Sequence, residues 1–215
     1  MTSRIKRTPA ARLGLRERNK LDKAQRIRAA ARDLFRKHGY EATTMRQIAL
    51  QAHVGLGTLF SYADDKRDLV FLIFNEELDM LTGRALTAPR PGAMLIDQLM
   101  AVFRRHYQQF AKHPTLSRLA LQELTFYSEG KQSQDFHAIR GQLIAGIERM
   151  VADAQRARRI RSTPDARRIA LQIFFLYAAA LRWWIAAPTP RVAAGLAELR
   201  RVLQLQMEGL APRGR

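Results

Sequence analysis

The chain has 215 residues, of which 47% are hydrophobic, and it contains no cysteine. This length and composition suffice for one or two domains with a buried core, and the lack of cysteine excludes disulfides, thiolate metal sites and a thiol nucleophile. The formal net charge of +18 favours polyanionic partners, with nucleic acid first and an anionic membrane second.

The positive charge is concentrated before residue 41, because residues 1–40 hold 13 Lys and Arg against 3 Asp and Glu. Residues 141–215 hold a second excess, 13 Lys and Arg against 5 Asp and Glu. A general preference for Arg explains this second excess as well as a polyanionic partner does. Residues 1–19 are expected to form a basic flexible leader. Such a leader either follows a minor groove or the DNA backbone, or only strengthens non-specific binding. Its basic residues, extended to the start of the first helix, are Arg4, Lys6, Arg7, Arg12, Arg16, Arg18 and Lys20.

Apolar residues recur at helical period along almost the whole chain, and no segment alternates as a strand does, which predicts an all-α fold. The first helix is expected from about residue 20 to residue 38, with Gly39 ending it in a left-handed conformation. The longest apolar stretch, IFFLYAAALRWWIAA, contains Arg182 and is short for a bilayer span. We therefore expect a soluble, cytoplasmic protein with no membrane partner. The apolar face of the first helix comprises Leu21, Ala24, Ile27, Ala31, Leu34 and Phe35.

Two short helices are predicted between residues 44 and 62. Thr44 is a good N-cap for the first of them, and the sequence HVG at residues 53–55 must turn the chain. The second helix begins near Leu56 and turns Leu59 inward. Two helices joined by a turn of three or four residues, after a longer helix, are typical of a helix-turn-helix, whose second helix fits a DNA major groove. The buried face of the first short helix is expected to be Ile48, Ala49 and Ala52.

The segment ARDLFRKHGYEATTMRQIALQAHVGLGTLFSYADDKRDL resembles the N-terminal domain of the TetR family of bacterial transcriptional repressors. It departs from that family's pattern at four positions, where His53 replaces a turn glycine, Gly55 a capping serine, Phe60 a DNA-contacting tyrosine and Ala63 a phenylalanine. The resemblance implies a helix-turn-helix domain over residues 20–66 and a ligand-binding and dimerisation domain over residues 67–215. The shared residues are Phe35, Gly39, Tyr40, Thr44, Ile48, Ala49, Ala52, Val54, Gly57, Thr58, Leu59, Tyr62, Lys66 and Leu69.

By this resemblance Thr44, Tyr62 and Lys66 contact DNA phosphates, and Thr44 and Lys66 do so beside helix N-termini, which favour anions. Arg46 either reaches a guanine in the major groove or is a solvated surface charge, and Tyr62 is either a DNA contact or a packing residue. The full set of expected DNA contacts is Thr44, Arg46, His53, Leu56, Gly57, Thr58, Tyr62 and Lys66.

A fourth helix is expected from near Asp64, and it is apolar nearly all round, so it should be buried on more than one side. The sequence TAPRPG, residues 87–92, then breaks the helical pattern and marks a domain boundary. Further helices are expected near residues 93–112, 114–127, 134–157, 165–187 and 190–210. The expected architecture is a three-helix N-terminal domain followed by a larger C-terminal helical bundle.

The resemblance further implies a small-molecule pocket in the second domain. Glu123 is the polar candidate, because it lies in register with apolar residues and needs either an arginine or a ligand as its partner. The pocket candidates are Phe74, Leu78, Phe103, Tyr107, Phe110, Glu123, Phe126, Tyr127, Phe174, Tyr177 and Trp183.

The same resemblance implies a homodimer formed through the last two helices, which carry broad apolar faces. The alternative is that both helices bury these faces within their own bundle. The interface candidates are Ile169, Ile173, Ala180, Trp184, Val192, Leu196, Leu199 and Leu203.

The sequence thus predicts a sequence-specific transcriptional regulator, a repressor released from a palindromic operator in double-stranded DNA by a small-molecule effector. No catalytic residue, metal or cofactor is expected, because the five histidines lack metal-binding spacing and no glycine-rich phosphate loop is present. The alternative is a nucleoid-type protein that binds DNA without sequence preference through its basic leader.

Overall fold

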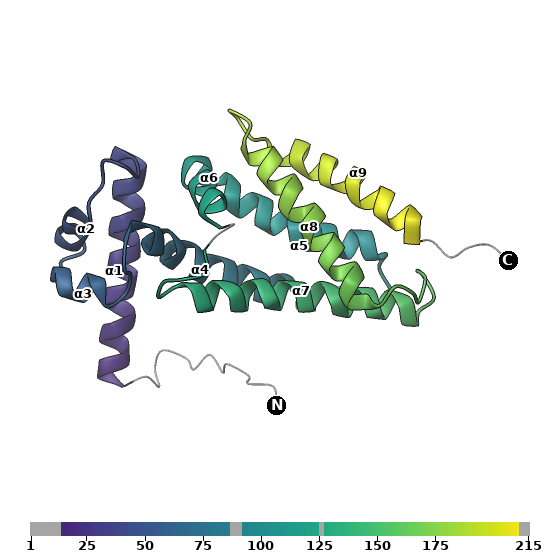
Figure 1. The fold of residues 1–215 in the computed structure, drawn as a ribbon, viewed down its shortest axis with the longest axis horizontal. Helices are drawn as coiled ribbons and strands as arrows, with labels where there is room; N and C mark the ends of the chain where they lie inside the picture. The colour runs from purple at the N-terminus through teal and green to yellow at the C-terminus, as the bar shows by residue number, and fades with distance from the viewer. Residues whose placement is uncertain (1–13, 87–91, 125–126, 211–215) are drawn as a thin grey trace. The chain divides into compact units, whose positions relative to one another are not determined.

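The computed structural model describes residues 14–86, 92–124 and 127–210. Throughout these ranges the regular structure is helical, from α1 to α9 (Figure 1), which confirms the all-α expectation. The chain divides into two compact units, residues 1–73 and residues 74–215. The division lies inside one helix, between the two positions that the sequence favoured, namely residue 66 and the break at residues 87–92.

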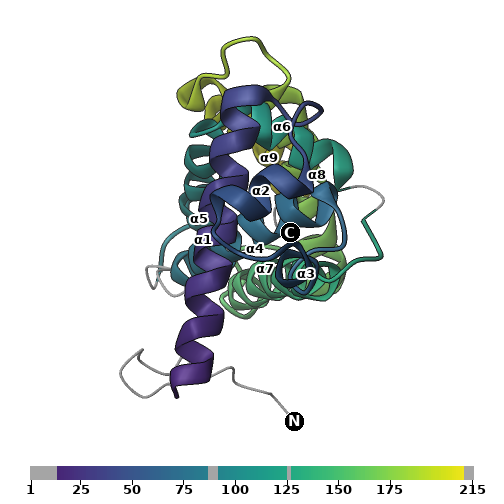
Figure 2. The same cartoon turned by 90° about the vertical axis from the view of Figure 1, so that its left-hand side faces the viewer.

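The first unit contains α1 (Leu15–His38), α2 (Met45–Gln51), α3 (Leu56–Phe60) and the start of α4 (Lys66–Leu86). Figure 2 shows α2 and α3 beside α1, whose first turns extend beyond them. Helix α1 begins five residues earlier than expected.

The early start of α1 changes the interpretation of the leader. Arg16, Arg18 and Lys20 lie exposed on a helix and not on a flexible arm. The other leader residues, Arg4, Lys6, Arg7 and Arg12, lie outside the described residues. The prediction that Leu21 is buried is wrong, because it is 52% exposed and precedes Ala24, the first buried residue of α1. The remaining predicted apolar positions of α1 are buried.

Gly39 ends α1 with φ 82° and ψ 165°. The φ angle is positive, as expected, but the ψ angle is extended and not that of a left-handed helix. Glycine reaches this region because it lacks a Cβ. The N–H of Gly39 donates to the carbonyl oxygen of Phe35, so the residue still satisfies one of the last carbonyls of the helix.

The second unit contains the rest of α4, α5 (Leu95–Ala111), α6 (Pro114–Glu123), α7 (Ser133–Arg156), α8 (Ala166–Ile185) and α9 (Val192–Leu210). Helix α8 lies between α7 and α9, and α5 packs against α9 (Figure 1). Each helix lies within a few residues of its expected range, except that α6 ends at Glu123, four residues early. Residues 68–75 of α4 are all buried, as the nearly continuous apolar sequence predicts.

Helix α8 is long and apolar enough to cross a membrane by length and composition, and 39% of its most apolar window is buried within the protein. Core helices of soluble proteins pass the same test. Its contacts with α7 and α9 are those of a bundle helix.

Gly195 sets the distance at which α9 packs on α8 and α5. A Cβ added to this glycine would lie 2.5 Å from Cδ1 of Trp184 and 2.7 Å from Cε1 of Tyr107. These distances are shorter than van der Waals contact, and both neighbours are rigid rings, so α9 can approach this closely only because residue 195 has no side chain.

We expect Gly195→Ala to lower the free energy of unfolding by about 2 kcal/mol, as overpacking of a dense core does. Gly209→Ala, in the same helix, is the matched control, because a Cβ there meets no atom within 4 Å. The control should leave the free energy of unfolding within about 0.5 kcal/mol of the original value or raise it, since alanine favours the helix. Urea denaturation of the two variants measures the difference, and equal midpoints would contradict this account of the packing.

Candidate DNA-binding surface and effector cavity

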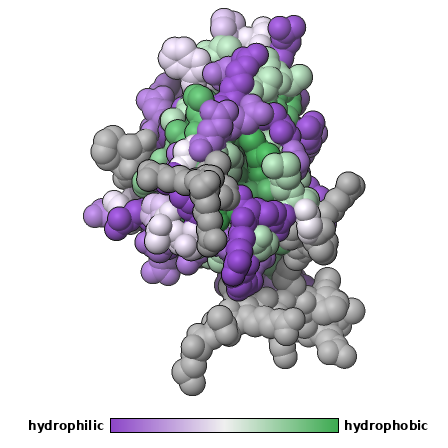
Figure 3. Space-filling model, turned by 90° about the vertical axis from the view of Figure 1, so that its right-hand side faces the viewer, coloured by the Kyte–Doolittle hydropathy of each residue, from purple (hydrophilic) through white to green (hydrophobic). Residues whose placement is uncertain are grey.

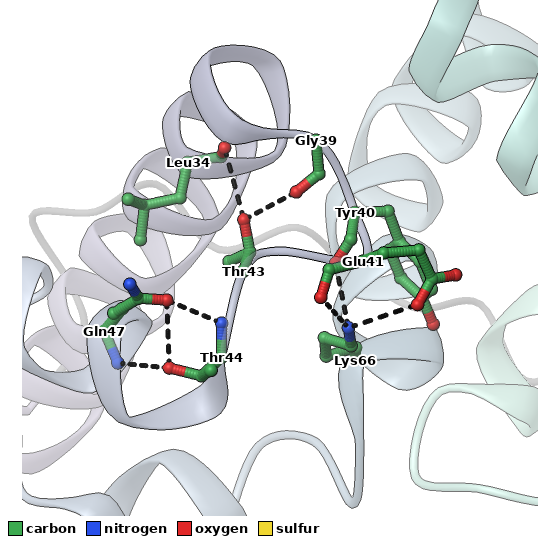
Figure 4. A network of polar contacts seen from close by, with 8 residues as sticks. All are labelled: Leu34, Gly39, Tyr40, Glu41, Thr43, Thr44, Gln47 and Lys66. Atoms are coloured by element: carbon green, nitrogen blue, oxygen red, sulfur yellow. Dashed lines mark hydrogen bonds and ion pairs between the residues drawn. The ribbon is translucent and has the colours of Figure 1, made fainter.

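Helix α2 starts at a capping box around Thr44 (Figure 4). The Thr44 hydroxyl accepts a hydrogen bond from the backbone N–H of Gln47 at 3.2 Å, and the Gln47 side-chain oxygen accepts one from the Thr44 N–H at 2.8 Å. This pairing satisfies two helix-end donors and confirms Thr44 as the N-cap. The apolar face of α2 is buried as predicted, at Ile48, Ala49 and Ala52.

Thr43 stabilises the connection between the end of α1 and the start of α2, and the sequence analysis did not identify it. Its hydroxyl lies 2.7 Å from the carbonyl oxygen of Gly39 and 3.3 Å from that of Leu34 (Figure 4). Thr43 is 1% exposed. A buried threonine next to a capping threonine therefore joins the end of α1 to the start of α2.

The turn between α2 and α3 is held by a residue of α1. His53 has φ 52°, a left-handed conformation that histidine tolerates better than most residues, so the turn forms without its usual glycine. Arg26 donates to the carbonyl oxygens of Ala52 at 2.9 Å and His53 at 3.1 Å, and to Asp22 at 3.0 Å. Arg26 was missed by the sequence interpretation, because its partners in the turn are 26 and 27 residues away.

His53→Gly should raise the free energy of unfolding by up to about 1 kcal/mol, because glycine adopts the left-handed conformation without strain. His53→Val should lower it by about 1–2 kcal/mol, since a β-branched side chain is strained there. Thermal denaturation measures both effects, and DNA titration of the stabilised glycine variant separately measures whether the His53 side chain contacts phosphate. A destabilised glycine variant would show that the turn carries no strain at this position.

Helix α3 presents an open outer surface. Leu59 is fully buried, as expected, while Leu56 is 37% and Phe60 42% exposed. Gly57 is exposed, and a Cβ added to it would meet no atom within 4 Å. Packing within the protein therefore does not require a glycine there, and the helix can approach another molecule closely at this point. Arg46 is exposed and Thr58 half-buried.

Two expected phosphate contacts already have partners within the first unit. The Tyr62 hydroxyl donates to the carbonyl oxygen of Lys20 at 3.0 Å. A phosphate also accepts hydrogen bonds, so Tyr62 would have to exchange one acceptor for the other. The Lys66 ammonium donates to the carbonyl oxygens of Tyr40 at 2.8 Å and Glu41 at 3.2 Å, and it lies 3.9 Å from the Glu41 carboxylate (Figure 4). A phosphate would therefore have to compete with that carboxylate for the ammonium.

The second unit contains a partly open cavity of about 190 Å³. Most of its wall is apolar and comes from helices α4 to α8, while five residues add polar atoms. The apolar lining residues are Leu78, Phe110, Leu121, Leu124, Phe136, Ile139, Leu143, Phe174, Ala178 and Leu181. The polar ones are Thr82, His106, Arg140, Tyr177 and Arg182.

Four of the predicted pocket residues line this cavity, namely Leu78, Phe110, Phe174 and Tyr177. Four others form a second layer of rings behind the wall. Ring-centroid distances in this layer are 4.3 Å for Phe103 and Tyr177, 4.6 Å for Tyr107 and Trp184, 5.8 Å for Phe74 and Phe110, and 6.3 Å for Tyr127 and Phe136.

The remaining three pocket predictions have different outcomes. Glu123 is the last residue of α6 and does not line the cavity. The placement of Trp183 is wrong, because its side chain is 84% exposed on the outside of α8. Phe126 lies outside the described residues. Helical register identified an apolar face in each case, but not the molecule or cavity that the face meets.

His106 and Tyr177 form a buried, hydrogen-bonded pair in the cavity wall. His106 Nδ1 lies 2.9 Å from the Tyr177 hydroxyl. Burial lowers the pKa of His106 to about 4, and it raises the pKa of Tyr177 far above its usual value. Both side chains are therefore neutral at pH 7. The sequence did place His106 between Phe103 and Phe110 on one helical face, and that position was the signal overlooked.

The outer face of α8 and α9 exposes three large apolar side chains among polar residues such as Gln204 and Glu208. Its most exposed large side chains are Phe175 at 62% and Trp183 at 84% on α8, and Leu205 at 69% on α9. Phe175, Ala179 and Trp183 follow one another at four-residue spacing and so share one side of α8. Apolar side chains also lie among hydrophilic ones on the side of the protein shown in Figure 3.

Most of the predicted interface residues do not belong to this outer face. Ile169, Ile173, Trp184, Leu196, Leu199 and Leu203 are all at most 6% exposed within the single chain, so these six predictions are wrong: the side chains are covered by their own bundle. Ala180 and Val192 are half-buried. The described residues contain no group of three or more His, Asp or Glu arranged to hold a metal ion.

Residues 27–73 match the family model described as bacterial regulatory proteins, tetR family. The chain is 40% identical over 58 residues to the HTH-type transcriptional regulator HbdR of Aromatoleum sp. (strain CIB). That match covers 27% of this chain and 25% of the relative, so it spans about a quarter of either protein.

Solved structures are similar over nearly the whole chain. Thermus thermophilus FadR, a TetR-family transcriptional repressor solved in complex with lauroyl-CoA, is 25% identical, with a TM-score of 0.67 and coverage of 89% of this chain and 97% of that one. Bacillus subtilis FadR, solved in complex with stearoyl-CoA, shares the fold at 22% identity, with a TM-score of 0.68 and coverage of 86% and 98%.

Proposed function

Since this chain is a helix-turn-helix transcriptional regulator of the TetR family, we propose that it is a homodimeric repressor that a small molecule releases from a palindromic operator. The observation that carries the DNA-binding part is the open outer surface of α3, where Gly57 leaves room for a close approach. The proposed site of action is the bacterial cytoplasm, where the operator is found.

The proposed dimer places two α3 helices in successive major grooves, about 34–36 Å apart. The outer face of α8 and α9 supports this assembly, because exposed aromatic side chains are enriched at the centres of protein interfaces. A two-fold axis through that face would bring each copy of Trp183 against the other protomer.

The proposed effector is an acyl-CoA or a related molecule with an apolar chain and an anionic part. The largely apolar wall of the cavity suits the chain, and Arg140 and Arg182 on its border suit the anion. The complex of Thermus thermophilus FadR with lauroyl-CoA supports this class. At about 190 Å³ the cavity is smaller than the roughly 300 Å³ at which typical ligand sites begin, so it accommodates the chain and not the whole cofactor.

The proposed route of release is helix α4. Its first residue, Lys66, binds the backbone that follows α1, and its later residues Leu78 and Thr82 line the cavity. A ligand that moved the second half of α4 would therefore act, through Lys66, on the backbone at Tyr40 and Glu41, which leads into α2. Such a ligand must bind the released state more tightly than the DNA-bound state.

Selection of duplexes from a random pool tests this function, at low and at physiological salt, with the full chain and with a variant lacking residues 1–13. A two-fold palindrome that is still enriched at the higher salt supports a sequence-specific dimer. The contrary result is binding without any enriched sequence, lost as salt rises or when residues 1–13 are removed. That result would favour the nucleoid-type alternative. The selected duplex then serves for titration with lauroyl-CoA, which should release it.

A further inference from the structure

The cavity wall holds a polar atom whose hydrogen bond is missing. His106 is 2% exposed and lines the cavity, and its Nε2 is buried with no hydrogen-bond partner in the described chain. Its Nδ1 is already used by the Tyr177 hydroxyl at 2.9 Å. Buried polar atoms are nearly always paired, and His106 lines the cavity, so Nε2 is the polar atom of this residue that remains for a molecule bound there.

The arrangement of protons decides whether Nε2 donates or accepts. If Nδ1–H donated to Tyr177, both the tyrosine O–H and the Nε2 lone pair would lack a partner. If the Tyr177 O–H donates to Nδ1, the single unpaired group is Nε2–H. The second arrangement leaves fewer buried groups unsatisfied, and it also uses the phenol as donor and the imidazole as acceptor, which are their stronger roles.

The neutral state of the imidazole is consistent with this assignment. Burial holds the pKa of His106 at about 4, so at pH 7 the ring carries one proton, and that proton is on Nε2. The imidazole is held by packing as well as by its hydrogen bond, since its centroid lies 6.5 Å from that of Phe103 and 5.6 Å from that of Tyr177. The donor therefore has a set position before any ligand enters.

We propose that the Nε2–H of His106 donates a hydrogen bond to an uncharged carbonyl oxygen of the effector, close to the effector's apolar chain. This proposal rests on the proposed effector function of the cavity and narrows it. The effector is then an acyl compound whose carbonyl enters the cavity with the chain, while its anionic part stays at the border with Arg140 and Arg182. An apolar chain without a carbonyl would fill the same space but leave the donor unpaired.

A matched pair of probes tests the proposal with the unaltered protein. Lauroyl-CoA carries a thioester carbonyl, and dodecyl-CoA is the thioether in which a CH₂ replaces it. Calorimetric titration of the full chain should give at least about tenfold tighter binding of the thioester, as expected for a site whose buried donor is otherwise left unpaired. His106→Leu should remove this preference while retaining binding of the thioether.

Tyr107→Phe is the control variant, because the Tyr107 hydroxyl is also buried without a partner but does not line the cavity. It should keep the preference for the thioester. Equal binding of the two probes by the unaltered protein would overturn the role of His106. It would still support the proposal that the cavity binds the effector. Binding of neither probe would overturn the acyl effector class and the role of His106 together, while the selected operator would remain as evidence for the DNA-binding function.

Discussion

Gly57→Glu should lower affinity for the selected operator by more than about 100-fold, which is about 3 kcal/mol. The substitution places a carboxylate at the start of α3, where the proposed interface meets phosphates, and juxtaposed like charges cost several kcal/mol. It should leave the fold intact, because Gly57 is exposed and a Cβ added there meets no atom of the protein within 4 Å. Fluorescence anisotropy with the labelled operator measures the affinity.

The control for this variant is Gly141→Glu on α7. Gly141 is also an exposed helical glycine whose added Cβ meets no atom within 4 Å, so both variants lose the same positive net charge. Only the change on α3 should abolish operator binding. An equal loss in both would mean that binding depends on total charge, and no loss in either would remove α3 from the interface.

Trp183→Glu should raise the dissociation constant of the homodimer by at least about 100-fold. The Trp183 side chain is 84% exposed on the free chain, and buried tryptophans at interface centres each contribute 2 kcal/mol or more. In a two-fold dimer the substitution occurs twice, and it also buries two carboxylates. Sedimentation velocity over a range of protein concentrations measures the association.

Met94→Glu is the comparison for Trp183→Glu. Met94 is 66% exposed and is the N-cap of α5, so it belongs to neither α8 nor α9. It should leave the dimer unchanged, and a carboxylate at a helix N-terminus is tolerated well. A Trp183 variant that remained dimeric would show that the protomers associate through another surface.

Local patterns in the sequence predicted the helices and the helix-turn-helix, because the period of apolar residues and the capping residues act within a few positions of the chain. Thr44 as N-cap and Leu59 as a buried residue depend only on such short-range rules. His53 differs, because it was singled out by the resemblance as the replacement of a turn glycine, and its φ of 52° fits that place.

The pocket and interface residues were predicted less well, because periodicity shows that a face is apolar but not what the face meets. Ile173 and Phe175 point to opposite sides of α8 and are both apolar, but the first is fully buried in the bundle and the second is 62% exposed. His106 and Tyr177 are 71 residues apart, and no local rule connects them. Such pairings are decided by tertiary packing.

The two layers of side chains around the proposed effector cavity would separate recognition from support. Side chains such as Leu78 and Leu121 touch the cavity, whereas Phe103 and Phe74 stand behind it and hold the wall. Mutations of the inner layer can therefore change the shape of the cavity while the outer layer keeps the bundle folded. During evolution such a protein can acquire a new chemical signal through few substitutions and keep the same operator, so that an existing gene comes under the control of a different metabolite.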